Sequence, residues 1–190
     1  MRDVAAACAV VAVLLSSTRA GAQLRYDVGA LAGASEHCVF DRPAGVGMPT
    51  PGPSLLLDGH VAVFPLLRVG AYAEGDVTDL DAPAPRWTLG GGLRLKITPP
   101  WPRGKWRAWL ATGFGYVGAY SPAAISAPAA GGGAFEIPVA LGASYRFRKP
   151  WVLLGELGTR FAFGHWGSLY ETRGPDLVTV GLSIGIGIDS

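Results

Sequence analysis

The sequence is poor in charge. Only 16% of its 190 residues are Asp, Glu, Lys or Arg, whereas 49% are hydrophobic; soluble domains usually carry about 25% charged residues. A soluble domain with so few charges would have difficulty covering its surface. The formal net charge of +2 is too small to indicate nucleic-acid binding. Beyond the N-terminal segment, no stretch supplies the roughly 20 consecutive apolar residues that a membrane helix needs.

Cysteine is also scarce, and one of the two cysteines lies in a segment of signal type. Arg2 gives a basic start, an apolar segment that contains Cys8 follows, and Ala20-Gly21-Ala22 fits the small-x-small cleavage pattern. We therefore expect a cleaved signal peptide (1–22) and a mature domain (23–190), the alternative being an uncleaved N-terminal helix. Because Cys8 lies inside the apolar segment, a lipoprotein cleavage site is not expected.

The mature domain then holds Cys38 as its one cysteine. An internal disulfide is excluded, and Cys38 is either an inert loop thiol, a reactive free thiol or an intermolecular link.

Eight segments of the mature domain alternate apolar residues with polar or small ones, which predicts β-strands. They lie near 24–33, 54–64, 67–78, 86–97, 106–117, 134–147, 151–163 and 176–188. Short connections alternate broadly with long ones, as periplasmic turns alternate with extracellular loops in membrane barrels. An even number of strands places both termini in the periplasm. Pro138, inside one segment, predicts a bulge or local irregularity, because proline removes a ladder donor.

Sorting the strands by parity gives one face without charge and a second that carries nearly all the strand charges. The second face holds the bases Arg25, Arg68, Arg86, Arg94, Lys96, Arg107, Arg146 and Arg160 and the acids Asp27, Asp58, Glu74, Asp76, Glu136 and Glu156. A soluble barrel turns its apolar face inward and a membrane barrel turns it outward. Aromatic residues near the strand ends, and polar faces made largely of glycine, favour the membrane barrel. Four apolar residues are exceptions, because their parity places them on the second, charged face: Leu31, Leu56, Phe64 and Trp109.

An eight-stranded barrel has room inside for side chains and little more. Because buried charges need partners, we expect an ionic plug in the lumen. A tight turn at Pro65-Leu66 would place Asp58 opposite Glu74 and His60 opposite Tyr72. The short turn at 148–150 would bring Arg160 diagonally near Glu136.

Three groups of residues are candidates for a chemical site. Asp58, His60 and Glu74 could form an acid–base site, but ions that fill a narrow lumen give the same pattern. His37, Cys38 and Asp41 form a weak metal candidate, and His165 with Ser168 matches no hydrolase spacing. The glycines of 90–92 and 181–187 lie in strands and lack the lysine of a phosphate loop. We assign no catalytic, cofactor-binding or metal-binding residue, and no cofactor.

The signal segment, the eight alternating strands and the opening Leu24-Arg25-Tyr26-Asp27-Val28-Gly29 resemble the small outer-membrane β-barrel proteins of Gram-negative bacteria. The resemblance covers residues 23–190 and implies an all-β, eight-stranded antiparallel up-and-down transmembrane barrel in the outer membrane. It implies insertion by the barrel-assembly machinery, which typically reads a strand with an aromatic end. Here Ile188-Asp189-Ser190 departs from that pattern.

Three functions follow as hypotheses. The first is a non-enzymatic, porin-like membrane barrel with a plugged lumen and a structural or surface-contact role, whose partners are outer-membrane lipid and lipopolysaccharide. The second is a lipid-modifying enzyme similar to a lipid A deacylase, which would need His and Ser together at the lipid-facing rim. The third is a narrow channel for small solutes. The sequence leaves the oligomeric state open.

Overall fold

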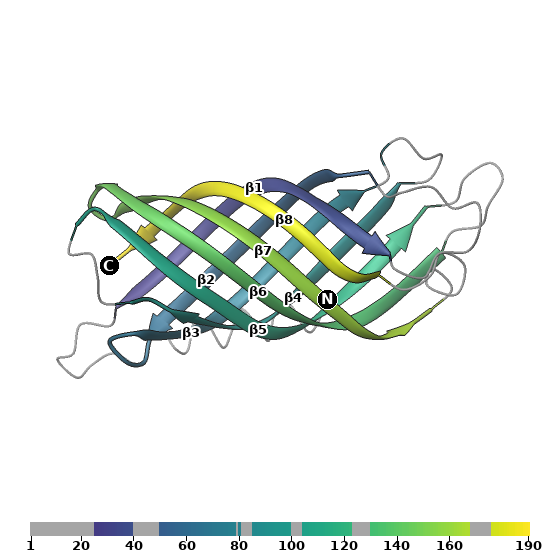
Figure 1. Ribbon diagram of the computed structural model, residues 1–190, viewed down its shortest axis with the longest axis horizontal. Coiled ribbons are helices and arrows are strands. Elements are labelled where there is room, and N and C mark those ends of the chain that lie inside the picture. Colours follow the sequence, from purple (N-terminus) through teal and green to yellow (C-terminus); the bar gives the residue numbers. More distant parts are fainter. Residues whose placement is uncertain are drawn as a thin grey trace.

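Eight antiparallel strands form a closed barrel within residues 25–39, 50–78, 80, 85–99, 104–122, 130–167 and 176–190, which the computed structural model describes (Figure 1). Each strand pairs with its neighbours in sequence, and the last strand pairs with the first. The strands are β1 (Tyr26–Val39), β2 (Gly52–Ala62), β3 (Leu67–Thr78), β4 (Arg86–Ile97), β5 (Trp106–Ser121), β6 (Ala130–Arg148), β7 (Trp151–Trp166) and β8 (Asp176–Asp189). The expected all-β, up-and-down antiparallel barrel is confirmed. The expected signal peptide (1–22) lies outside the described residues.

None of the described residues forms a helix that is long and apolar enough to cross a membrane.

The two ends of the barrel differ in their connections. Residues 63–66, 98–105 and 149–150 join strands at the end where the C-terminus lies, which we call the turn end. Residues 40–51, 79–85, 122–129 and 167–175 join strands at the opposite end, the loop end. Five strands, β1, β2, β5, β6 and β7, extend further toward the loop end than the alternation predicts. In β1, for example, pairing with β8 continues to Cys38↔Val178, because main-chain hydrogen bonds need no apolar alternation.

The register between β2 and β3 corrects two expected pairs. Asp58 lies opposite Tyr72 and His60 opposite Gly70, so neither Asp58–Glu74 nor His60–Tyr72 is a cross-strand pair. The expected tight turn is present, since Leu67 N donates to Phe64 O at 3.2 Å.

A bulge next to this turn accounts for one residue of the shift. The amides of Val63 and Phe64 both donate to Leu67 O, at 3.0 and 3.1 Å, so two residues of one strand face one of the other. The shift amounts to two residues, and each side chain therefore keeps its predicted face.

Pro138 interrupts its ladder without shifting it. Between β5 and β6 the pairs run from Thr112↔Val139 directly to Gly115↔Glu136 in the same register, and the positions around Pro138 are skipped. Pairing with β7 continues through Pro138↔Arg160. The expected irregularity is confirmed as a local loss of pairing, while the register shifts of β6 lie at 133–135 and 146–148.

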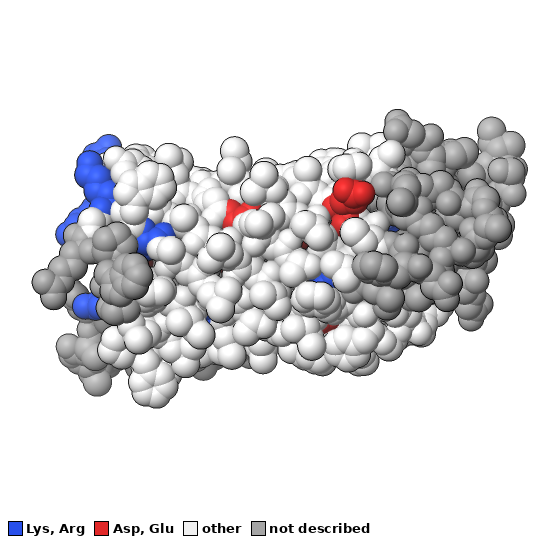
Figure 2. Space-filling model, viewed as in Figure 1, with Lys and Arg blue, Asp and Glu red and all other residues white. Residues whose placement is uncertain are grey.

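The outer surface is apolar, as the parity predicted. Leu89, Leu93 and Ile184 are each at least 70% exposed, and Figure 2 shows a largely uncharged wall. The aromatic residues near the strand ends are exposed: Tyr26, Trp87, Trp106, Tyr116, Phe135, Phe147, Trp151 and Phe163. The ten residue-to-residue steps from Trp106 to Tyr116 span about 33 Å along β5, or roughly 25 Å along the axis of a barrel with strands tilted by about 40°. That is the height of the apolar band of membrane barrels.

Candidate functional site: an ion-paired lumen

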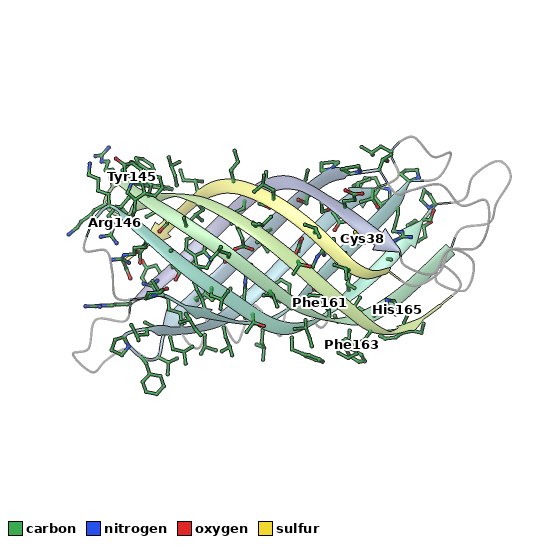
Figure 3. All side chains as sticks on the ribbon, viewed as in Figure 1. Cys38, Tyr145, Arg146, Phe161, Phe163 and His165 are labelled. Carbon is green, nitrogen blue, oxygen red and sulfur yellow. The ribbon has the colours of Figure 1, made fainter. Side chains whose placement is uncertain are left out.

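Acidic and basic side chains of the described residues lie inside the barrel, among the side chains drawn in Figure 3. The seven acids are Asp27, Asp58, Glu74, Asp76, Glu136, Glu156 and Asp189, and the seven bases are Arg68, Arg86, Arg94, Lys96, Arg107, Arg146 and Arg160. Their formal charges therefore cancel. Most of them join one of three clusters that follow one another from the turn end to the loop end.

The turn-end cluster is centred on Asp189. Arg107 Nη1 and Arg146 Nη2 both lie 2.5 Å from Asp189 Oδ2, and Arg68 Nη2 lies 3.2 Å from Asp189 Oδ1. Arg68 also donates to Asp27. Since Asp27 and Asp189 lie directly opposite each other in β1 and β8, Arg68 bridges two carboxylates that would otherwise repel each other.

The middle cluster joins Asp58 and Glu156 through Arg94. Arg94 Nη2 donates to Glu156 Oε1 at 2.6 Å, and its Nη1 lies 3.4 Å from Asp58 Oδ2. Lys96 links this cluster to the turn end, because its Nζ is 2.8 Å from Asp27 Oδ1 and 3.7 Å from Asp58 Oδ2. Residues of β2, β4 and β7 are thus tied together across the lumen.

Arg160 holds the loop-end cluster. Its Nη2 lies 2.7 Å from Asp76 Oδ2 and 3.3 Å from Glu74 Oε1, and its Nη1 lies 4.0 Å from Glu136 Oε2. The last contact confirms the expected diagonal approach of Arg160 to Glu136. Tyr72 Oη donates to Glu136 Oε1 at 2.6 Å. One guanidinium therefore faces three carboxylates.

A cavity of about 30 Å³ separates the middle and loop-end clusters and is lined by Glu74, Arg94, Glu156 and Arg160. This volume suits about one water molecule. Glu156 Oε2 and Arg94 Nε are both buried without a hydrogen-bond partner among the described residues. The lining is therefore polar enough to hold water, and the cavity is too small for a larger solute.

Apolar side chains complete the packing of the lumen. Leu31, Leu56 and Trp109 are all at most 6% exposed, which confirms their inward parity, whereas Phe64 lies in the β2–β3 turn and is exposed. Leu31 and Leu56 pack with Tyr72. The Lys96 ammonium lies 4.7 Å from the centroid of the Trp109 ring, a cation–π distance.

Gly142 gives Trp109 its space, and an alanine there is expected to destabilise the barrel by about 1–3 kcal/mol through overpacking. A Cβ at Gly142 would lie 2.2 Å from Trp109 Cε2. The matched control is Gly155→Ala, because a Cβ at Gly155 meets nothing within 4 Å. Urea unfolding followed by tryptophan fluorescence measures both variants, and equal unfolding midpoints would contradict the packing argument.

The candidate acid–base trio is not assembled. Asp58 and His60 approach each other, with Nδ1–Oδ2 at 3.8 Å, but Glu74 contacts Arg160 in the loop-end cluster. Asp27, Asp58 and His60 do bring one ligand atom each within 4.8 Å of one another. Lys96 already supplies a positive charge between the two carboxylates, so this set of donors does not favour a metal ion.

A hydroxyl–imidazole–carboxylate chain, which parity alone did not indicate, lies at the loop end. Thr179 Oγ1 is 3.2 Å from His37 Nδ1, and His37 Nε2 is 2.9 Å from Asp76 Oδ1. The order matches that of a hydrolase triad. However, Asp76 is shared with Arg160, all three side chains are buried, and the adjoining cavity holds about 30 Å³. We therefore interpret these three hydrogen-bonded side chains as stabilising the interior of the barrel.

The remaining candidates do not form sites within the described residues. His37 faces the lumen, while its neighbour Cys38 has the opposite parity and is a free, half-buried thiol. Asp41 and Ser168 lie outside the described residues, so neither the His37–Cys38–Asp41 group nor the His165–Ser168 pair is tested. The glycine stretches 90–92 and 181–187 lie in β4 and β8 as expected.

Known proteins resemble this chain in structure but not in sequence. No family model matches the chain, and no curated protein matches it. Solved structures do match, and they share its fold, an eight-stranded barrel that is also found in small outer-membrane proteins of Gram-negative bacteria. Neisserial surface protein A has a TM-score of 0.64 at 12% identity, over 87% of this chain and 97% of that one.

Two further matches belong to the same class. The attachment invasion locus protein Ail of Yersinia pestis gives a TM-score of 0.56 at 7% identity, over 88% of this chain and 97% of its own. The outer-membrane protein OprG of Pseudomonas aeruginosa gives 0.56 at 10% identity, over 88% and 96%. At such identities the matches establish the fold.

Proposed function

We propose that the protein is an integral outer-membrane barrel with a sealed lumen, and that its role is structural or depends on contacts made by its surface and loops. The observation that carries the proposal is the ion-paired lumen. Three clusters link strands across the barrel, and the cavities at the middle and near the turn end hold only about 30 Å³ each. The fold and the apolar exterior support insertion in a membrane.

The arrangement of charge explains why a sealed lumen is stable. Each cluster sets guanidinium or ammonium groups within 4.0 Å of carboxylates, so few charges of the described residues are left without a partner. Opening a path for ions would break several of these pairs together, and each unpaired buried charge costs several kcal/mol. Enzymatic and transport functions are less well supported, since both need room beside the polar groups.

Purified barrel in planar bilayers is expected to give no steady current at moderate voltage, because the ion-paired side chains of the described lumen leave cavities of only about 30 Å³ at its middle and near the turn end. The control is a double variant, Arg94→Ala with Glu156→Ala, which removes the cross-lumen pair of the middle cluster and enlarges the cavity. A measurable current from this variant alone fits the proposal. A steady current from the unaltered protein would support the small-solute channel instead.

Location and folding are tested in cells and on gels. The protein should fractionate with the outer membrane, together with lipopolysaccharide, and the unheated sample should migrate differently from the boiled one. Folding by the barrel-assembly machinery can be followed by the same shift. A soluble periplasmic protein would refute the proposal, and release of fatty acid from purified lipopolysaccharide would favour the deacylase-like alternative.

A further inference from the structure

Four exposed bases follow the edge of the turn end, and we call them the basic rim: Arg25, Lys105, Arg148 and Lys149. Figure 2 shows basic side chains gathered at this end of the barrel. Backbone hydrogen bonds make the rim a continuous arc, since Arg146 N donates to Lys105 O, Asp189 N to Pro150 O and Ser190 N to Tyr26 O. The arc thus covers β5, β6, β7, β8 and β1.

The rim bases differ from the lumen bases in having no acidic partner among the described residues. Arg68, Arg107 and Arg146 face Asp189 inside the barrel. None of the ion pairs within the described residues uses a rim base. The positive charge of the rim is therefore directed to the surroundings of the barrel.

The connections between strands show the same separation of charge between the two ends of the barrel. Those at the turn end contain the bases Arg103, Lys105 and Lys149 and no acid. Those at the loop end contain four acids and two bases: Asp41, Asp79, Asp81, Glu171, Arg42 and Arg173. The molecule therefore presents positive charge at one end, and an anionic partner is favoured there.

Aromatic side chains fix the level of the rim relative to a membrane. The Trp106 and Tyr145 rings lie 4.8 Å apart on the outer surface, and Lys105 Nζ lies 5.9 Å from the centroid of Tyr145. Exposed Trp151 immediately follows the turn that carries Lys149. Tryptophan and tyrosine occupy the membrane–water interface, so the adjoining bases lie at the depth of lipid headgroups.

We propose that the basic rim binds the phosphate of anionic phospholipids in the membrane leaflet at the turn end. This inference rests on the proposed membrane location. Guanidinium and ammonium groups donate to phosphate oxygens, and bases beside a membrane favour anionic over zwitterionic lipid. The rim would thereby hold the barrel at a defined depth and orientation.

The test compares lipid binding by the folded barrel in detergent micelles that contain phosphatidylglycerol or phosphatidylcholine, with native mass spectrometry as the readout. Heat-modifiable mobility of the same sample is checked first; its absence counts against the proposed function and not against the rim. We expect preferential retention of phosphatidylglycerol. The triple variant Lys105→Gln, Arg148→Gln and Lys149→Gln should lower that affinity about 100-fold at low salt, about fivefold for each base.

The matched control is Glu36→Gln, which removes an exposed charge from β1 toward the loop end and should leave the preference unchanged. Equal retention of both lipids by the unaltered barrel would overturn the proposal. An unchanged preference in the folded triple variant would also overturn it. Sedimentation with purified peptidoglycan, without a preference for phosphatidylglycerol, would assign the rim to the cell wall instead.

Discussion

Replacing Arg160 with methionine is expected to lower the free energy of unfolding by about 3–5 kcal/mol, the usual cost of removing one partner from a buried ion pair. Arg160 is 7% exposed and lies between the carboxylates of Asp76, Glu74 and Glu136. Without it, three acids face one another in the lumen. The measurement is urea unfolding of the refolded barrel in lipid vesicles, followed by tryptophan fluorescence.

Two further variants separate lost attraction from lost packing. Arg148→Met removes an exposed arginine and should change stability by less than about 0.5 kcal/mol. Neutralising the partners of Arg160, with Glu74→Gln, Asp76→Asn and Glu136→Gln, should restore most of the loss, because no unpaired charge remains. If Arg160→Met and Arg148→Met unfold at the same urea concentration, Arg160 does not hold the loop-end cluster together.

The alternation of side chains predicted the two faces of the barrel because parity depends only on the extended backbone. Leu31 and Trp109 show how far this reaches. Hydrophobicity alone would assign both to lipid, yet their parity placed them inside, where they are 1% and 5% exposed. The diagonal approach of Arg160 to Glu136 was also predictable, because a short turn limits the possible register.

Parity could not supply the exact register at the other tight turn. Asp58 lies opposite Tyr72 instead of Glu74, and the bulge at Val63 and Phe64 contributes one residue of this shift. The residues that form a bulge have no characteristic sequence pattern, so the turn sequence alone did not reveal the bulge. The acid–base hypothesis for Asp58, His60 and Glu74 depended on that register.

The sequence also could not predict which side chains pair across the lumen. Arg94 of β4 binds Glu156 of β7, and Arg160 of β7 binds Asp76 of β3. These strands are not neighbours, so their contacts depend on how the barrel closes and on the tilt of its strands. The sequence indicated that charges would pair inside, but the partners follow from closure.

Asp189 is the main lumen residue that the alternation did not reveal. Its replacement by asparagine is expected to cost about 2–3 kcal/mol of stability, somewhat below the usual cost of breaking a buried pair, because its partners are partly exposed. The alternation ends at Ile188, so Asp189 looked like a residue beyond the strand. In the barrel it ends β8, is 8% exposed and accepts hydrogen bonds from Arg68, Arg107 and Arg146. The same urea unfolding assay measures the loss.

The double variant Asp189→Asn with Arg107→Gln tests whether the lost stability comes from arginines left without an anion. Removing Arg107 with Asp189 leaves fewer like charges close together, so the combined loss should be smaller than the sum of the single losses. Glu36→Gln is the control for loss of an exposed carboxylate. Strict additivity, or an Asp189→Asn variant as stable as Glu36→Gln, would mean that backbone pairing of β1 with β8 closes the barrel without help from this cluster.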